Sequence, residues 1–140
     1  MMFFIGFPLL LIPFAIYNIL AFLTPGVSFT EPVITVSMLS GGEWKISAGD
    51  LLVMLGILLL FVEIIKATRL GMRAIMDHML SLTLLIAMLG EFVMVARVAT
   101  STFFILMLLS FIDVISGFSV TIRTAQRDLS VEGVERMQSS

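Results

Sequence analysis

The chain has 140 residues, of which 59% are hydrophobic and 13% are charged, and its mean hydropathy is +1.14. Soluble domains have about 45–50% apolar and about 25% charged residues, so this composition excludes an ordinary soluble domain and favours a membrane protein. A net charge of −2 gives no reason to expect a nucleic-acid partner, and the absence of cysteine excludes disulfides, thiolate metal sites and cysteine nucleophiles.

The first predicted membrane span comprises residues 3–23, which are numerous and apolar enough to cross the ~30 Å core of a bilayer as a helix. Pro8 and Pro13 each remove a backbone hydrogen-bond donor, so we expect the first half of this helix to be kinked or unwound. Tyr17, near the far end, is of a type common at membrane interfaces. The Thr-Pro-Gly run at 24–26 then ends the helix.

Residues 27–50 form a long connection after this span. The run 33–39 is rich in β-branched residues, a Gly-Gly pair follows at 41–42, and 44–47 is a second extended run, which together predict a short β-hairpin on the extracytoplasmic side. Trp44 is expected to act as an anchor at the bilayer interface. The hairpin is interpreted either as a docking surface for a partner or simply as the covered end of a loop.

The second predicted span is 51–67, with Asp50 as its N-cap. Helical spacing places Gly56 and Glu63 on one face, and a small residue on such a face indicates close packing against another helix. Lys66 follows Glu63 by three residues, a spacing that allows an ion pair at the membrane interface.

The third predicted span, 74–96, has Asp77 and His78 near its start and Glu91 in its far part. Asp77 and Glu91 are separated by 14 residues and therefore share nearly the same helical face. A separate stripe of small residues offers a surface on which another helix can pack, and consists of Thr83, Ala87 and Gly90.

The fourth predicted span, 100–120, contains a carboxylate well inside an apolar run. Asp113 shares a face with Ser110 and Gly117, whereas bulky rings such as Phe111 lie on the opposite face. An ionised side chain at the centre of a membrane helix costs about 2.5–3.5 kcal/mol, so such a residue normally faces the protein interior or a wet cavity. The sequence therefore predicts an all-α membrane protein, a four-helix bundle with a polar seam.

The distribution of basic residues predicts the orientation of this bundle. Six basic residues lie on one side of the predicted spans and two on the other: Lys66, Arg69, Arg73, Arg123, Arg127 and Arg136 against Lys45 and Arg97. The positive-inside rule then places both termini in the cytoplasm. We expect one membrane domain, 1–129, in which the fourth helix ends near residue 129, and a frayed polar cytoplasmic tail at 130–140. This general shape is that of a small multi-pass protein of the bacterial inner membrane.

The ionisable residues inside the spans are the candidate site. Counted at 1.5 Å per residue, Glu63 and Asp113 share one depth, Asp77 and His78 lie just below them, and Glu91 stands apart as a second polar position, with Arg97 or a polar group of the hairpin as its expected partner. A structural interpretation has these acids, protonated or paired, hydrogen-bonded across the bundle. The alternatives are a path for protons or ions and a metal site of two carboxylates and one imidazole.

The sequence contains no nucleophile elbow, metalloprotease helix or phosphate-binding loop, so we expect a protein that is not an enzyme and uses no cofactor. The predicted function is that of an accessory, structural or assembly subunit on a larger membrane complex, or else a small homo-oligomer. The alternative is a small oligomeric transporter or proton-coupled carrier that uses Glu63, Asp113 and His78. The expected surroundings are lipid and other membrane proteins.

Overall fold

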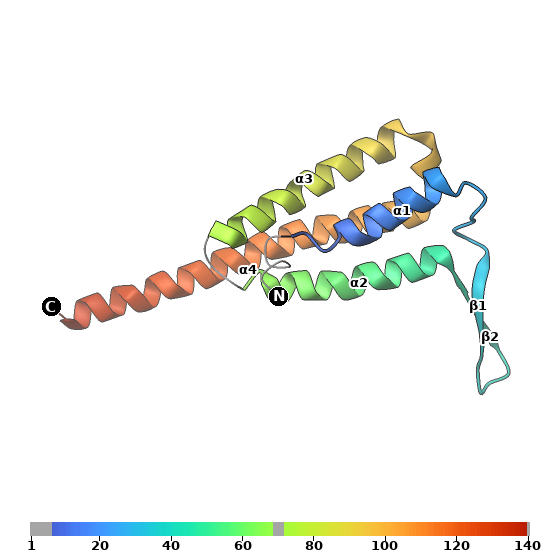
Figure 1. Ribbon diagram of the computed structural model, residues 1–140. Coiled ribbons are helices and arrows are strands. Elements are labelled where there is room, and N and C mark those ends of the chain that lie inside the picture. Colours follow the sequence, from blue (N-terminus) through green and yellow to red (C-terminus); the bar gives the residue numbers. More distant parts are fainter. Residues whose placement is uncertain (1–6, 69–71, 140) are drawn as a thin grey trace.

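The computed structural model describes residues 7–68 and 72–139, which are mostly helical. A two-stranded antiparallel hairpin lies between the first two helices (Figure 1). The elements in chain order are α1 (Leu11–Leu23), β1 (Pro32–Ser37), β2 (Glu43–Ser47), α2 (Ala48–Lys66), α3 (Met72–Met94), the short 3₁₀ helix η2 (Ala96–Val98) and α4 (Ser101–Ser139).

Three of the predicted spans coincide with helices that are long and apolar enough to cross a membrane, namely 48–66, 75–94 and 101–120. The first predicted span is different, because α1 has only 13 residues and is therefore shorter than the roughly 20 that a bilayer requires. It begins after Pro8, as the expected unwinding of its first half requires. Residues 3–6 of that span lie outside the described residues. Three candidate spans are thus present, and a fourth is not shown.

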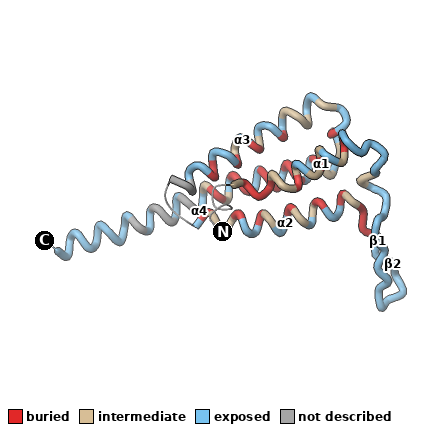
Figure 2. The backbone as a smooth tube through the Cα atoms, in the orientation of Figure 1, coloured by how far each residue is buried: buried red, intermediate tan, exposed pale blue. Residues whose placement is uncertain are grey.

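Helix α4 is central to the packing, since α2 and α3 both lie along it and α1 contacts α2 and α4 (Figure 1). Small residues permit the close approach of α2 and α4. A Cβ atom at Gly56 would come within 2.9 Å of a methyl group of Leu109, and one at Gly49 within 2.6 Å of the Thr102 hydroxyl. The buried residues line the inner sides of these helices, and large apolar side chains remain exposed on their outer sides (Figure 2). Such an apolar exterior suits a lipid environment.

Tyr17, a residue of interfacial type, is fully buried among other side chains of the protein. Its ring stacks on Phe29 with centroids 4.3 Å apart and meets Phe103 edge-on at 5.1 Å. Its hydroxyl is hydrogen-bonded to Oγ1 of Thr100, which also accepts the Phe103 amide at the start of α4. The phenol can be buried because Thr100 supplies the partner that its polar end needs.

The predicted hairpin is confirmed, with Val36 paired to Trp44 and Ser37 to Glu43. Its turn is closed by hydrogen bonds between Met38 and Gly42 and between Gly41 and Met38. Gly41 has φ +88°, a left-handed conformation that favours glycine.

Two helix ends differ from the sequence-based expectation. Ser47, rather than Asp50, is the N-cap of α2, and the two residues exchange the hydrogen bonds of a capping box. Helix α4 does not end near residue 129 but continues to Ser139, because the segment contains no proline and many good helix formers. Its 39 residues span about 58 Å, so its last turns extend beyond the other helices (Figure 1).

Candidate functional site

A cluster of buried polar side chains lies where α2, α3 and α4 meet near the start of α1. Its members include all four residues of the predicted intramembrane cluster: Glu63 from α2, Asp77 and His78 from α3, and Asp113 from α4. Each is at most 6% exposed. Helical spacing therefore predicted the right face of each helix.

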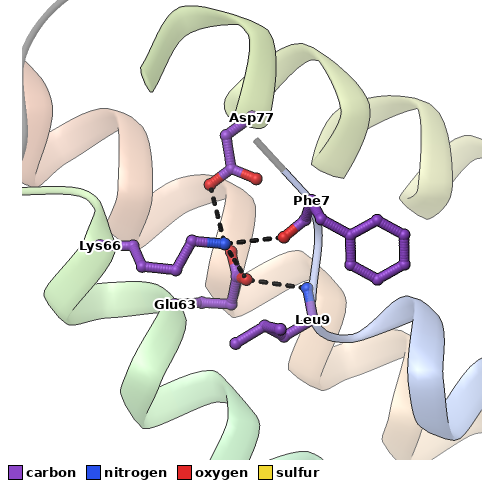
Figure 3. Close-up of polar contacts among 5 residues, drawn as sticks. All are labelled: Phe7, Leu9, Glu63, Lys66 and Asp77. Carbon is purple, nitrogen blue, oxygen red and sulfur yellow. Dashed lines mark hydrogen bonds and ion pairs between the residues drawn. The ribbon is translucent and has the colours of Figure 1, made fainter. Parts of the chain in front are cut away.

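Glu63 and Lys66 hold the segment that precedes α1 (Figure 3). Oε1 of Glu63 accepts a hydrogen bond from the backbone amide of Leu9 at 2.8 Å, and Nζ of Lys66 donates to the carbonyl oxygen of Phe7 at 2.7 Å. In a regular helix the Phe7 carbonyl would accept the Leu11 amide, but that amide bonds to Pro8 instead. Side chains of α2 thus satisfy backbone groups that the proline turn leaves outside the α1 helix.

Lys66 also connects α2 to α3. Its ammonium nitrogen lies 3.0 Å from Oε1 of Glu63 and 3.6 Å from Oδ2 of Asp77 (Figure 3). The predicted pair between Glu63 and Lys66 is therefore present. Its position is largely buried, because the Lys66 side chain is only 10% exposed. One cation joins three segments of the chain, and this explains why two carboxylates can lie so close together.

Asp113 completes the cluster from α4. Its carboxyl group is hydrogen-bonded to the side chain of Ser81 and lies near enough to Glu63 and Asp77 for electrostatic interaction. Among the described residues, Oδ1 of Asp77 and Oγ of Ser110 are buried without a hydrogen-bond partner. The cluster therefore joins α2, α3 and α4 to the segment that precedes α1. It also contains these two polar atoms that have no hydrogen-bond partner among the described residues.

The His78 imidazole lies directly against α4. A Cβ atom at Gly117 would come within 2.9 Å of its Cε1 and 3.1 Å of its Nδ1, and its ring centroid lies 5.1 Å from that of Phe118. Only a glycine leaves room for the imidazole at this point, so the position of His78 depends on Gly117.

Glu91 and Trp44 lie outside the cluster. Glu91 is half-buried and its carboxyl group is hydrogen-bonded to Asn18 of α1, which was not its expected partner. Arg97 instead donates to the carbonyl oxygen of Ala21 at 3.3 Å. Trp44 lies on β2 and is 47% exposed.

The sequence missed two features of the cluster. The pair between Glu63 and Lys66 was predicted, but the contacts of Lys66 with Phe7 and Asp77 were not. The sequence analysis also assigned no role to Ser81. The available signal was Pro8, because a proline near a helix start frees backbone groups that need partners. The described residues contain no group of three His, Asp or Glu side chains placed to hold a metal ion.

An apolar groove of about 320 Å³ between α1 and α3 is the second notable feature. Leu11 and Phe14 form one wall, and Thr83 and Ala87 lie on the other. Gly90 continues this stripe by one turn, and a Cβ atom there would meet nothing within 4 Å. Within residues 7–68 and 72–139, no side chain thus fills the space in front of the predicted stripe of small residues.

No protein-family model, curated protein or solved structure matches this chain.

Proposed function

We propose that this protein is a four-span accessory or assembly subunit of a larger complex in the bacterial inner membrane. In this proposal α1, with the residues before it, forms the fourth span, and both termini are cytoplasmic. The orientation is supported by basic residues: Lys45 and Arg97 lie in the hairpin and η2, at one end of the helices, whereas the C-terminal turns of α4 project from the other end (Figure 1).

The groove between α1 and α3, which none of the described side chains fills, is the observation that supports a partner. Small residues at a membrane helix surface allow two backbones to approach closely, and packing of this kind drives helix association in lipid. Thr83 and Ala87 are exposed and Gly90 is half-buried. By contrast, small residues of α2 such as Gly56 are already packed against α4. The occupant that fits best is a transmembrane helix of another protein.

The buried cluster fits a structural role within this subunit. Glu63 and Lys66 fix the entry of α1, which forms one wall of the groove, and Asp77 links them to α3, which forms the other wall. The polar contacts therefore set the separation of the two helices that would receive the partner.

Ala87→Phe tests this proposal, because the added ring would fill the groove. Ile86→Phe is the matched control. It places the same ring on the preceding residue of α3, which is 63% exposed and does not line the groove. A C-terminally tagged protein would be extracted in mild detergent and analysed on a native gel with mass spectrometry. We expect stoichiometric companions for the wild type and for Ile86→Phe, and their loss for Ala87→Phe.

Two outcomes would contradict the proposal. Companions retained equally by Ala87→Phe and Ile86→Phe would exclude the groove as the contact. Migration of the wild type without companions would exclude an accessory role, and a band that contains only copies of the protein would identify a homo-oligomer.

A small proton-coupled carrier is the second candidate, and it is supported by the buried Asp113 and by Oδ1 of Asp77, which is buried and has no hydrogen-bond partner in the part of the chain that the structure describes. Asp113→Asn separates the two functions, because the amide keeps the shape and a hydrogen bond to Ser81 but cannot exchange a proton. A carrier would lose flux in proteoliposomes while the fold remained intact. In the structural role Asp113→Asn would be mild, and Asp113→Leu, which cannot bond to Ser81, would lower the melting temperature.

A further inference from the structure

The hairpin has two chemically different faces. Directly paired residues in an antiparallel ladder point to the same side, and alternate residues along a strand share a face. The pairs Ile34–Ile46 and Val36–Trp44 therefore form one apolar face. The pairs Thr35–Lys45 and Ser37–Glu43 form the opposite, polar face.

Among the described residues, the apolar face is covered only at its base. Ile46, next to the start of α2, is 6% exposed, whereas Ile34, Val36 and Trp44 are 46%, 38% and 47% exposed. An isolated two-stranded hairpin with such a face is only marginally stable in water, so this surface requires a cover.

The position of the hairpin indicates what that cover is. Strand β2 leads without an intervening loop into α2, so the base of the hairpin lies at the level where this candidate span enters the bilayer. From there the hairpin runs across the axis of α2 and projects beyond the side of the helices (Figure 1). If α2 crosses the bilayer, a hairpin in this position would lie along the membrane surface.

We propose that the hairpin lies flat on the phospholipid headgroup region beside α2, with Ile34, Val36 and Trp44 turned to the lipid. The buried base of the same face supports this direction, since Ile46 turns toward the helices and hence toward the membrane. Lys45 and Glu43 then face water. Tryptophan favours this region because its ring is apolar and its N–H can bond to polar groups there.

Trp44 is the one tryptophan in the chain, so its fluorescence reports on this face alone. The full chain would be reconstituted without other proteins into vesicles of phosphatidylethanolamine and phosphatidylglycerol, with and without lipids brominated near the headgroup end of the acyl chain. The matched control moves the indole to the polar face by Lys45→Trp in a Trp44→Phe background.

For Trp44 we expect blue-shifted emission, severalfold stronger quenching by the brominated lipid than in the control, and weaker quenching by acrylamide. Equal behaviour of the two tryptophans would overturn the proposal. So would protection of Trp44 that appears only in native membranes, which would identify a protein as the cover, or protection that disappears as the protein is diluted in lipid, which would identify a second copy.

Discussion

The ammonium group of Lys66 donates a 2.7 Å hydrogen bond to the carbonyl oxygen of Phe7, across 59 residues of sequence. The same nitrogen pairs with Glu63 on its own helix and with Asp77 on α3. A single side chain thus fixes the entry of α1 relative to two other helices.

Lys66→Met should therefore lower the free energy of unfolding by about 3 kcal/mol, because it leaves Glu63 and Asp77 buried without their cation. Reversible unfolding in mixed micelles would measure the change. Lys45→Met, on the exposed polar face of the hairpin, is the control and should change it by less than about 0.5 kcal/mol. Equal losses for the two variants would show that the contacts of Lys66 contribute no more than a surface charge.

Gly117→Ala and Gly90→Ala should have opposite effects on the same measurement. The new methyl group at 117 would meet the His78 ring, and overpacking of this kind costs about 1–3 kcal/mol. At 90 it would enter open space, so the higher helix propensity of alanine should stabilise by about 0.5–1 kcal/mol. His78→Ala should relieve the cost at 117. Failure of that double variant to recover stability would contradict the contact.

Tyr17→Phe should destabilise the protein by about 1 kcal/mol, because the ring contacts with Phe29 and Phe103 remain while the bond to Thr100 is lost. Thr100→Val removes the other partner, together with the acceptor of the Phe103 amide. A double-mutant cycle would measure the coupling between Tyr17 and Thr100, and we expect the two losses not to add. Strict additivity would mean that the two hydroxyl groups do not interact.

Gly41→Ala should loosen the hairpin by about 1 kcal/mol, since a residue with a Cβ atom is strained at φ +88°. Gly42→Ala is the control, because its Cβ would make only an ordinary contact with Oγ of Ser40 at 3.5 Å. Hydrogen exchange at the Met38 amide, which bonds to Gly42, would measure the opening. Faster exchange in both variants alike would place the strain elsewhere in the turn.

The sequence predicted the helices and the hairpin because the signals for these elements are local. Crossing lipid requires about twenty apolar residues whatever their partners are, and the runs around Glu63, Asp77 and Asp113 meet this condition. The Gly41-Gly42 turn between β-branched segments likewise depends on backbone chemistry within a few residues.

Side-chain partners are not local, and sequence reasoning was weaker there. Helical spacing predicted the buried face of each span, and the depth of each residue along its helix then grouped Glu63, Asp77, His78 and Asp113. The spacing could not show that Glu91 would bond to Asn18 and not Arg97, because this depends on how α1 is rotated against α3.

By itself, then, the sequence determined the apolar helices, the hairpin and the set of buried acids, since composition and local backbone preference specify these features. The tertiary structure alone decided that Lys66 would bond to Phe7, that Tyr17 would be buried beneath Thr100 and that Gly117 would receive His78. Each of these contacts joins segments far apart in the chain. Each requires a distance of a few ångströms, which only the packing of whole helices can set.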